Sequence, residues 1–476
     1  MLTKLFIIST SLCVGFTLNA KPCITESCFV EHTNNEVLDL PDSEMTKEAL
    51  PILVSYLNNH PNIVEVHLNY QASCSDSHDC WDYIRDAGAL ALSGIKQLKR
   101  IDMSGAHITD VGVQALANNK SLTHLDLSRN ALTDAIGSFL GNLANLIELK
   151  LDGISTFGDL AVTEIAKSTS LKTLSMNNFM SHDPVTDMGA FALAANSSIT
   201  YLDLAGKKVG PLGAKAFSQN HVLDFLNLYG NNIRDEGAIA LADSPTITRL
   251  NLSSNGLTAA SATALSKNPR LKELNLDSNQ IRDEGAIALA SMATLDKLVA
   301  SSNSIGERGL LAIASNPYIT SVSVSLNPVS MKVAEAFGRQ KNFKELILNF
   351  VGMSDEKVSA ISANTNLEKL QVGSGAITSA SMLYLSELPK LQYLSLFQNM
   401  ITDAGVTILV QSKSLTALQL YGNRIGDGGA YALASDKMLT SLDIRYNCIG
   451  DAGQNLLKAK IPQALVVPQK DNRECP

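Results

Sequence analysis

The amino-acid sequence predicts a solenoid of short α/β repeats, with a parallel β-sheet on its concave side and short α-helices on its convex side. An apolar start returns every 24 residues at eleven consecutive positions between residues 199 and 439. Each start opens a pattern of the type LxxLxLxxN, which alternates as a strand with one buried face. The segment IRDEGAIALA occurs identically at residues 233–242 and 281–290, two periods apart. A fixed period of this length indicates units that contact only their neighbours.

The repeats continue toward the N-terminus with less regular spacing. Further starts lie at Leu171, Leu146, Leu122, Leu98 and Ile63. A degenerate start near Asn35 is also expected, because the residues that follow it still read as a strand. We therefore expect about seventeen turns of one scaffold. No second domain is needed, since a solenoid has no single compact core that limits its size.

Within a repeat, the strand is followed by an asparagine whose amide can pair with turn backbone that would otherwise be buried unpaired. This asparagine ladder comprises Asn130, Asn231, Asn255, Asn279, Asn303, Asn327, Asn399, Asn423 and Asn447. The next residues predict a short helix, in which Asp235 or Asp283 fits the N-cap. Small residues such as Gly237 and Ala238 let that helix lie close to the sheet.

This pattern resembles the leucine-rich repeat superfamily, and within it the helix-bearing class similar to ribonuclease inhibitor. The 24-residue unit with its DxGAxALA segment is most similar to GALA-type repeats of bacteria. The resemblance covers nearly all of the chain after residue 20, but repeats of this kind serve many unrelated partners. It therefore implies the fold and does not identify a ligand.

The first 20 residues read as a secretory signal peptide, with Lys4 as its charged start, an apolar run over residues 5–18 and Ala20 before the expected cut. The apolar run is short for a membrane anchor. We expect an exported protein that is secreted, held in the periplasm or cell envelope, or delivered to a host. The predicted parts of the exported chain are an N-terminal cap with a degenerate first repeat in residues 21–62, the solenoid in residues 63–461 and a C-terminal cap tail in residues 462–476.

Six of the seven cysteines remain after signal removal, and they lie toward the two ends of the chain. Proximity in a solenoid favours three disulfides, which join Cys23 to Cys28, Cys74 to Cys80, and Cys448 to Cys475. Disulfides persist outside the reducing cytosol, so the cysteines and the signal peptide support each other. The alternative is a metal site built by Cys74, His78 and Cys80, but the spacing lacks the paired CxxC of structural zinc, and we predict no bound metal.

Two inserts fall between strand and helix, on one edge of the predicted solenoid. The larger, in residues 70–83, contains Trp81, the only tryptophan of the chain, and the second covers residues 177–184. Loops on one edge of a repeat array are common binding elements, which makes Trp81 a candidate contact. The alternative is that the first insert shields the N-terminal core and the second is neutral. The asparagine ladder also breaks, at Ala106, Ile154, Lys207, Val351 and Gly375.

Exposed strand positions are the best candidates for a binding site, because core packing does not dictate their side chains. Tyr201, Phe225 and Tyr229 fall on adjacent strands. A second group covers three consecutive strands near the C-terminus and comprises Tyr393, Phe397, Tyr421, Arg445 and Tyr446. Strands about 4.8 Å apart would make each group a contiguous patch. Aromatic residues and arginine anchor many protein interfaces, although aromatic residues also stack across strands and stabilise sheets.

The sequence does not favour catalysis, since it lacks the GxSxG, HExxH, GxxxxGK[ST] and GxGxxG motifs. No cofactor is expected. His67 and His124 share the exposed sheet face two strands apart, where histidines are usually only solvated. A net charge of -8 and the absence of any run of basic residues disfavour a nucleic-acid partner.

We therefore predict a monomeric, non-enzymatic protein that binds a protein partner through the concave face and the strand-edge loops. One alternative follows from residues 40–57, which resemble the start of the F-box carried by some GALA-repeat proteins. That reading implies a host-directed effector that modulates ubiquitination, although residues 63–68 already return to a repeat strand. The other alternative is an extracellular glycan-binding module whose aromatic faces stack on sugar rings.

Overall fold

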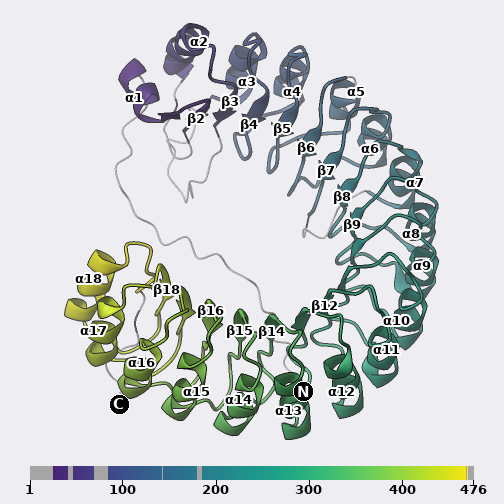
Figure 1. Ribbon diagram of the computed structural model, residues 1–476. Coiled ribbons are helices and arrows are strands. Elements are labelled where there is room, and N and C mark those ends of the chain that lie inside the picture. Colours follow the sequence, from purple (N-terminus) through teal and green to yellow (C-terminus); the bar gives the residue numbers. More distant parts are fainter. Residues whose placement is uncertain are drawn as a thin grey trace, which may run out of the picture. The chain divides into compact units, whose positions relative to one another are not determined.

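A computed structural model describes residues 25–40, 45, 47–68, 84–141, 143–178, 185–467 and 469. The chain divides into two compact units, residues 1–207 and 208–476. Both units consist of very short strands that alternate with short helices (Figure 1). Within each unit the strands form the inner layer and the helices the outer layer, which confirms the predicted α/β solenoid.

The first unit opens with a short hairpin, in which β1 pairs antiparallel with β2, and β2 to β8 are then parallel neighbours. Its strands are β1 (Thr33–Asn34), β2 (Val37–Asp39), β3 (Glu65–His67), β4 (Arg100–Asp102), β5 (His124–Asp126), β6 (Glu148–Lys150), β7 (Thr173–Ser175) and β8 (Tyr201–Asp203). Its helices are α1 (Glu26–Glu31), η1 (Lys47–Ala49), α2 (Leu50–Asn59), α3 (Arg85–Ser93), α4 (Asp110–Leu116), α5 (Ile136–Leu140), α6 (Asp159–Ile165) and α7 (Asp187–Ala195).

The second unit is more regular, because all of its strands pair in parallel at the 24-residue register, as when Leu250 lies opposite Leu226 and Leu274. Its strands are β9 (Phe225–Asn227), β10 (Arg249–Asn251), β11 (Glu273–Asn275), β12 (Lys297–Val299), β13 (Ser321–Ser323), β14 (Glu345–Ile347), β15 (Lys369–Gln371), β16 (Tyr393–Ser395), β17 (Ala417–Gln419) and β18 (Ser441–Asp443). Its helices are α8 (Pro211–Phe217), α9 (Arg234–Leu241), α10 (Ala259–Leu265), α11 (Arg282–Leu289), α12 (Glu307–Ser315), α13 (Met331–Arg339), α14 (Asp355–Ser362), η2 (Ser379–Ser381), α15 (Met382–Ser386), α16 (Asp403–Leu409), α17 (Asp427–Ser435) and α18 (Asp451–Lys460). Strands β2 to β18 confirm the expected number of about seventeen turns.

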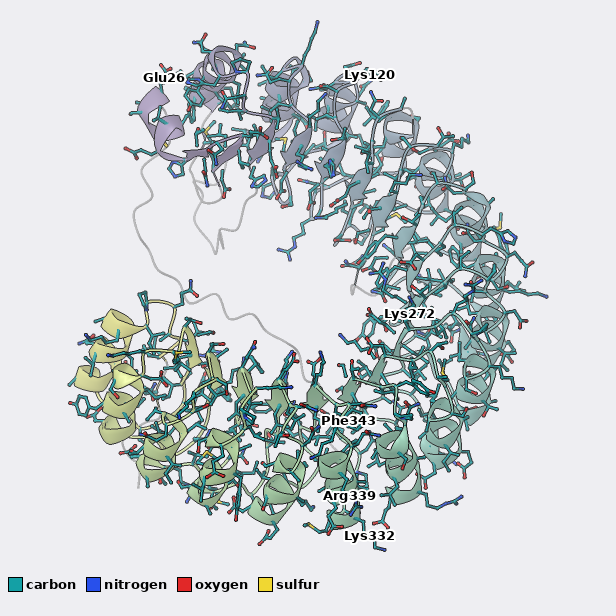
Figure 2. The ribbon with its side chains drawn as sticks, in the orientation of Figure 1. Glu26, Lys120, Lys272, Lys332, Arg339 and Phe343 are labelled. Atoms are coloured by element: carbon teal, nitrogen blue, oxygen red, sulfur yellow. The ribbon has the colours of Figure 1, made fainter. Side chains whose placement is uncertain are left out.

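The core lies between the strands and the helices of each unit. The leucines of the strand pattern are buried, and larger side chains fill the space beneath the helices. Phe337 and Phe343 are fully buried and meet edge to face, with ring centroids 5.5 Å apart. Figure 2 shows Phe343 on the inner side of α13, whereas Lys332 and Arg339 of that helix point outward. Each repeat therefore buries its apolar face against its own helix and its neighbours.

The asparagine ladder links each turn to its neighbours. The Asn255 Nδ2 atom donates to the carbonyl oxygens of Leu228, at 2.7 Å, and Ser253, at 3.0 Å. Its Oδ1 atom accepts from the backbone N–H of Ile233 at 3.2 Å, and the Oδ1 atom of Asn279 accepts from the Asn255 N–H at 3.1 Å. The predicted pairing of these amides with turn backbone is confirmed.

The predicted N-cap role of Asp235 and Asp283 is wrong. Helix α9 begins one residue before Asp235, and its N-cap position is Ile233, which makes no side-chain cap bond. The Asp235 carboxylate instead accepts from the Thr258 N–H at 2.8 Å and the Thr258 hydroxyl at 2.6 Å, at the start of α10. Asp283 likewise accepts from the Gly306 N–H at 2.7 Å. Each aspartate caps the helix of the following repeat, because adjacent helices lie side by side and their first N–H groups lack partners within the helix.

The breaks in the ladder are filled in different ways. Lys207 is 4% exposed, and its Nζ atom lies 5.5 Å from the centroid of the Phe157 ring. The Ile154 carbonyl accepts from the side chain of Asn178 at 3.3 Å. The breaks at Val351 and Gly375 do not disturb strand pairing, since β14 and β15 keep the 24-residue register.

Several predictions fall on residues that the structure does not describe. These residues are the signal peptide, Trp81 and the rest of the first insert, and Cys23, Cys74, Cys80 and Cys475. Cys28 and Cys448 are each disulfide-bonded, but their predicted partners lie outside the described residues, so the pairings stay predictions. In the described part of the chain, no helix combines the length and the apolar character needed to cross a membrane.

The stretch that resembles the start of an F-box is built into the N-terminal core. Its described part forms η1 and most of α2, and the Leu53 and Leu57 side chains of α2 are fully buried. Tyr56 of the same helix is 2% exposed and packs its ring 5.5 Å from that of Phe29 in α1. The apolar face of this helix is therefore used within the unit.

Candidate functional site

Aromatic side chains gather on the exposed sheet face of the second unit, at the carboxyl ends of its last strands. Phe397 and Tyr421 stand two residues beyond β16 and β17, and Phe350 and Tyr446 stand three residues beyond β14 and β18. We call these four residues the aromatic platform. Their position on successive parallel strands places them along one margin of the sheet.

The platform contains two pairs of rings in contact. The centroids of Phe350 and Phe397 are 5.7 Å apart, and those of Tyr421 and Tyr446 are 5.0 Å apart with an edge-to-face geometry. The guanidinium carbon of Arg445 lies 5.9 Å from the Tyr421 ring centroid. Phe350 and Tyr446 are 41% and 39% exposed, so the platform presents apolar area to solvent.

Gly373, two residues beyond β15, makes the first pair possible because β15 lies between the strands that lead to Phe350 and Phe397. A Cβ atom at this position would overlap three atoms of the Phe397 ring. The glycine leaves room for Phe397 to lean across β15 toward Phe350, which comes from two strands away. Tyr421 leans the other way, toward Tyr446.

Tyr393 does not join the other predicted residues of the C-terminal group. It stands four residues before Phe397 on the same extended segment, so the two side chains lie toward opposite ends of the strand. The Lys369 Nζ atom lies 5.1 Å from the Tyr393 ring centroid, and burial raises the pKa of the Tyr393 phenol. The predicted patch therefore divides into the platform and a separate Tyr393–Lys369 pair.

The other predicted aromatic group spans the two units. Tyr201 belongs to β8 of the first unit, whereas Phe225 and Tyr229 lie in and just after β9 of the second. Within the second unit, the Arg249 guanidinium carbon lies 5.2 Å from the centroid of the Phe225 ring. Stacking of this kind stabilises a sheet surface, and it is the alternative to a binding role for these aromatic residues.

The charged side chains beside the platform are paired. The Arg445 guanidinium donates two hydrogen bonds to the Asp443 carboxylate, at 2.9 and 2.7 Å, and these bonds raise the pKa of Arg445. The Lys369 Nζ atom lies 2.7 Å from the Glu345 Oε1 atom. The Arg445–Asp443 pair therefore neutralises charge beside the platform, whereas the Lys369–Glu345 pair lies with Tyr393 at the starts of the strands.

Two glutamine side chains lie on the sheet face next to the platform. The Gln371 Oε1 atom accepts from the Asn349 amide at 3.3 Å, and the Gln419 Oε1 atom accepts from the Ser395 hydroxyl at 2.9 Å. Within the described part of the chain, neither glutamine donates a hydrogen bond from its amide nitrogen. Each nitrogen carries two donors, so both side chains can offer hydrogen bonds to a ligand.

Sequence reasoning missed Phe350, and it also missed Leu326, which is 50% exposed at the equivalent position of the preceding repeat. Both residues have left-handed backbone, with φ of 57°. The available signal was a bulky side chain directly before the ladder position, where other repeats carry glycine, as at Gly230 and Gly422, or serine.

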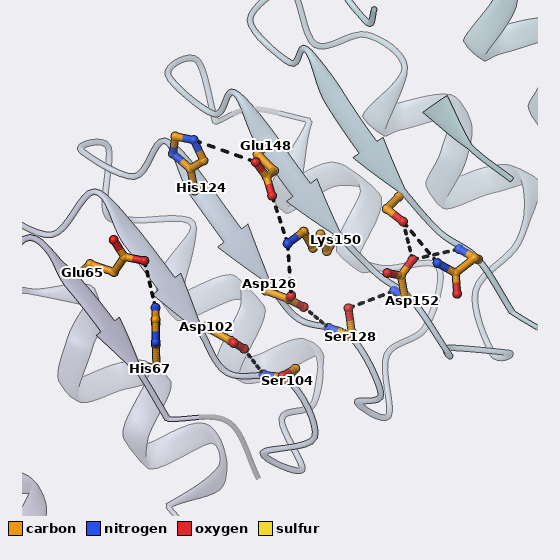
Figure 3. Close-up of polar contacts among 12 residues, drawn as sticks. Glu65, His67, Asp102, Ser104, His124, Asp126, Ser128, Glu148, Lys150 and Asp152 are labelled. Carbon is orange, nitrogen blue, oxygen red and sulfur yellow. Dashed lines mark hydrogen bonds and ion pairs between the residues drawn. The ribbon is translucent and has the colours of Figure 1, made fainter. Parts of the chain in front are cut away.

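The sheet face of the first unit carries a charged network over β3 to β6 (Figure 3). The His67 Nε2 atom lies 2.8 Å from the Glu65 Oε1 atom. The Lys150 Nζ atom lies 3.1 Å from Glu148 and 3.9 Å from Asp126. His124 lies two strands from His67 on the same face, as predicted, with 4.0 Å between its Nε2 atom and Glu148.

Burial and neighbouring charges tune this network. Burial raises the pKa of the Asp126 carboxyl, and the Asp102 carboxylate adds to the rise. Burial lowers the pKa of the His124 imidazole, and Arg100 lowers it further. Among the described residues, no cluster of three His, Cys, Asp or Glu side chains is arranged to hold a metal. These charges pair with one another, so we interpret the network as part of the sheet surface.

Comparison with known proteins agrees with this architecture. A family model described as "Leucine rich repeat" matches residues 245–305, and a second with the same description matches residues 97–117, 118–141, 219–242, 411–434 and 435–453. The chain therefore contains leucine-rich repeats. The comparison does not distinguish GALA-type repeats from other subclasses.

Among solved structures, this leucine-rich repeat chain is similar to an internalin from Listeria monocytogenes. The two sequences are 21% identical, and the match covers 82% of this chain and 88% of the internalin chain, with a TM-score of 0.36. Comparison with curated proteins gave no match.

Proposed function

We propose that this leucine-rich repeat protein is an exported, non-enzymatic scaffold that binds a protein partner through the aromatic platform of its second unit. The platform carries the proposal, because it places four aromatic rings outside the core at positions where the repeat pattern requires none. Exposed aromatic residues bordered by arginine are typical anchors of protein interfaces, since they bury a large rigid area at little cost in conformational entropy.

A purely stabilising role explains the platform less well. Phe350 and Tyr446 hold left-handed backbone, with φ of 57° and 54°, which costs about 1–2 kcal/mol per residue for side chains other than glycine. Both side chains remain substantially exposed, so little apolar burial offsets that cost. The same left-handed conformation recurs at this position in other repeats, as at Ser302 and Ser374, so it belongs to the repeat, and the exposed aromatic area is what favours binding.

A crosslinking pull-down with the full-length chain tests the proposal. The test variant changes Phe397, Tyr421 and Tyr446 to alanine. The matched control changes Tyr318, Tyr384 and Tyr431, which are 55%, 43% and 51% exposed in the same unit but lie away from the platform. We expect the test variant to lose the crosslinked partner and the control to keep it, with both variants folded by circular dichroism.

Equal recovery of the partner by wild type and by the platform variant would refute the proposed site. Export is tested separately by N-terminal sequencing of the chain from culture fractions. A mature protein that begins after residue 20 in the secreted or periplasmic fraction is the expected result, and an unprocessed cytoplasmic chain would contradict export.

A further inference from the structure

We infer that the helical surface of the first unit is a second docking site, which takes an amphipathic α-helix of a partner protein whose apolar face is bordered by lysine or arginine. The site is separate from the aromatic platform and goes beyond the proposed function. It depends on three observations, which are a row of exposed apolar side chains, a row of aspartates beside it and the hydrogen bonds that align both rows.

Exposed apolar residues recur at one position of successive helices in the outer layer of the first unit (Figure 1). Val111, Leu160 and Met188 are the second residues of α4, α6 and α7, and they are 65%, 72% and 64% exposed. Ala135, just before α5, is exposed at the equivalent position. We call these four residues the apolar ridge. Contiguous exposed apolar surface of this kind marks interaction sites.

The repeat itself does not require apolar side chains at the ridge position. Beyond Leu212 in α8, the second unit carries Glu236 and Glu284 there in α9 and α11, and Lys332 in α13. These helices keep the same register with a charged side chain at that position. Packing within the solenoid therefore does not explain the apolar ridge.

Hydrogen bonds between repeats hold the ridge residues side by side. Asp159 and Gly189 directly flank two successive ridge residues, and the Asp159 carboxylate accepts from the Gly189 N–H at 2.9 Å. Asp134 and Ala161 flank the preceding two in the same way, with 3.1 Å between the Ala161 nitrogen and the Asp134 carboxylate. Gly189 permits this approach because an added Cβ atom would lie 2.7 Å from the Asp159 Oδ1 atom. The ridge is thus one continuous row.

A carboxylate stands directly before each ridge residue. We call these residues the aspartate row, which comprises Asp110, Asp134, Asp159 and Asp187. The hydrogen bonds to the first three come from backbone N–H groups and threonine hydroxyls, which are neutral, so the carboxylates keep their negative charge. The exposed residues three positions after the ridge lie on the same helix faces and are uncharged, and they are Gln114, Ser138, Thr163 and Phe191.

The charge beside the ridge selects a basic partner. An apolar row bordered by carboxylates complements an apolar face bordered by lysine or arginine, whose long stems also pack on apolar surface. A second copy of this chain would add another aspartate row to the contact and no basic row. An anionic membrane or a nucleic acid would be repelled by the same carboxylates.

The helical surface also favours a helix over an extended segment. Backbone groups in a helix bond within that helix, so an added strand would find no row of free backbone donors and acceptors there. An amphipathic helix satisfies its own backbone and packs its side chains against other helices. The ridge and the aspartate row therefore fit an amphipathic helix with a basic border.

Fluorescence anisotropy with the full-length protein at low salt tests the inference. The probe is a labelled peptide of three copies of the heptad Leu-Lys-Lys-Leu-Leu-Lys-Lys. One control peptide has glutamate for every lysine, and another has the same composition in an order that is not amphipathic. The ridge variant is Leu160→Ser, Met188→Ser. Its matched control is Leu383→Ser, Tyr431→Ser, which changes side chains that are 52% and 51% exposed on helices of the second unit.

We expect the basic amphipathic peptide to bind at least tenfold more tightly than either control peptide, and its binding to weaken as salt is added. The ridge variant should weaken binding at least tenfold, because two apolar contacts are lost, and its control should not. Asp159→Asn should weaken binding about twofold, since it removes one exposed charge and leaves an oxygen to accept from Gly189. Asp283→Asn, at the equivalent capping position of the second unit, should have no effect.

Equal binding of the basic and acidic peptides, or unchanged binding by the ridge variant, would overturn the inference. A wild-type dimer in sedimentation that the ridge variant abolishes would also overturn it, because the ridge would then bind a second copy. The ridge substitutions alter mostly exposed side chains, and thermal unfolding of the variant checks that lost binding is not lost folding.

The variant of Phe397, Tyr421 and Tyr446 separates this inference from the proposed function. It should bind the basic peptide as wild type does, even though it loses the crosslinked partner. Loss of peptide binding in that variant would place the peptide on the platform and overturn the inference. Partner recovery that is independent of the platform would refute the proposed function alone.

Discussion

At the scale of single residues, the same side-chain types serve different ends according to their register position. Phe343 opens its repeat and is fully buried, whereas Phe350, seven residues later, is exposed at the margin of the sheet. The effect of Gly373 also depends on its register position, because the next repeat carries Phe397 at the same position. A substitution at a buried position such as Phe343 should therefore change stability, whereas one at an exposed position such as Phe350 should change binding.

Gly373→Ala should reduce partner binding with little effect on stability. The new Cβ atom would displace the Phe397 ring and break its contact with Phe350. Because the obstructing atoms belong to a side chain that can rotate, we expect a stability change below about 1 kcal/mol. Pull-down and thermal unfolding measure the two effects. The control Gly94→Ala, at a position with no heavy atom within 4 Å of the added Cβ, should change neither, and a stability loss without a binding loss in Gly373→Ala would contradict the prediction.

Asp235→Ala should destabilise the protein by about 1 kcal/mol, as expected for loss of a helix cap. The carboxylate accepts hydrogen bonds from Thr258 and Ser261 of the next repeat. Urea unfolding at neutral pH measures the loss. Glu236→Ala, at the exposed neighbouring position, is the control and should cost much less.

The destabilisation by Asp235→Ala should also depend on pH. Burial tends to raise the pKa of the Asp235 carboxyl, but the hydrogen bonds from Ser261 and Thr258 outweigh it and lower the pKa below its usual value of 3.8. A lowered folded-state pKa means that the stabilisation is complete above the usual value and is lost as the pH falls through the folded value. The difference between wild type and variant should shrink in acid, and a difference that persists below the folded pKa would disprove this account.

At the scale of secondary-structure elements, close packing between successive helices limits what each can carry. Gly338, near the end of α13, faces the backbone of α14, and an added Cβ atom would overlap the Ala360 carbonyl oxygen. The residues on either side of Gly338 in α13 are larger, but Phe337 is buried in the core and Arg339 is exposed. The spacing of the two helices therefore depends on a residue without a side chain.

Gly338→Ala should destabilise the second unit by about 1–3 kcal/mol, the usual cost of overpacking. Unlike at Gly373, the obstructing atom is backbone, so relief requires movement of a whole helix. Hydrogen exchange should show faster exchange in α13 and α14 than in wild type, with α9 and α10 unchanged. Wild-type stability for this variant would mean that the two helices separate at little cost.

The strands and the asparagine ladder were predictable because burial repeats with a fixed period, and every copy reinforces the same register. The role of Asp235 was not, because its partner lies in the next repeat and depends on how adjacent helices are aligned. Phe397 and Tyr421 follow the ends of β16 and β17, and Tyr446 follows the end of β18, whereas Tyr393 is the first residue of β16. Counting strands in the sequence does not show which end of a strand a side chain occupies.

At the scale of the whole molecule, the ends of the repeat array need covers. A repeat is stabilised by a neighbour on each side, and a terminal repeat lacks one of them. At the N-terminal end, α1 packs Phe29 against Tyr56, and Cys28 of the same helix is disulfide-bonded. At the C-terminal end, Leu465 pairs beside Asp443 of the last strand, and Cys448 is disulfide-bonded. Both ends thus combine a short covering segment with a covalent link.

Reduction of the disulfides should loosen the two ends of the protein before its middle. In a linear array, loss of a cap exposes the apolar side of the repeat beneath it, while distant repeats keep both neighbours. Hydrogen exchange with and without reductant should show faster exchange first at β2 and β18 and unchanged exchange at β11. Alkylation and mass measurement of a chain that begins after residue 20 should count no free thiol before reduction and six afterwards. Cys28→Ser should cause faster exchange at β2 alone. A uniform increase in exchange along the chain would contradict the prediction, because it would show that the disulfides stabilise the whole array and not only its ends.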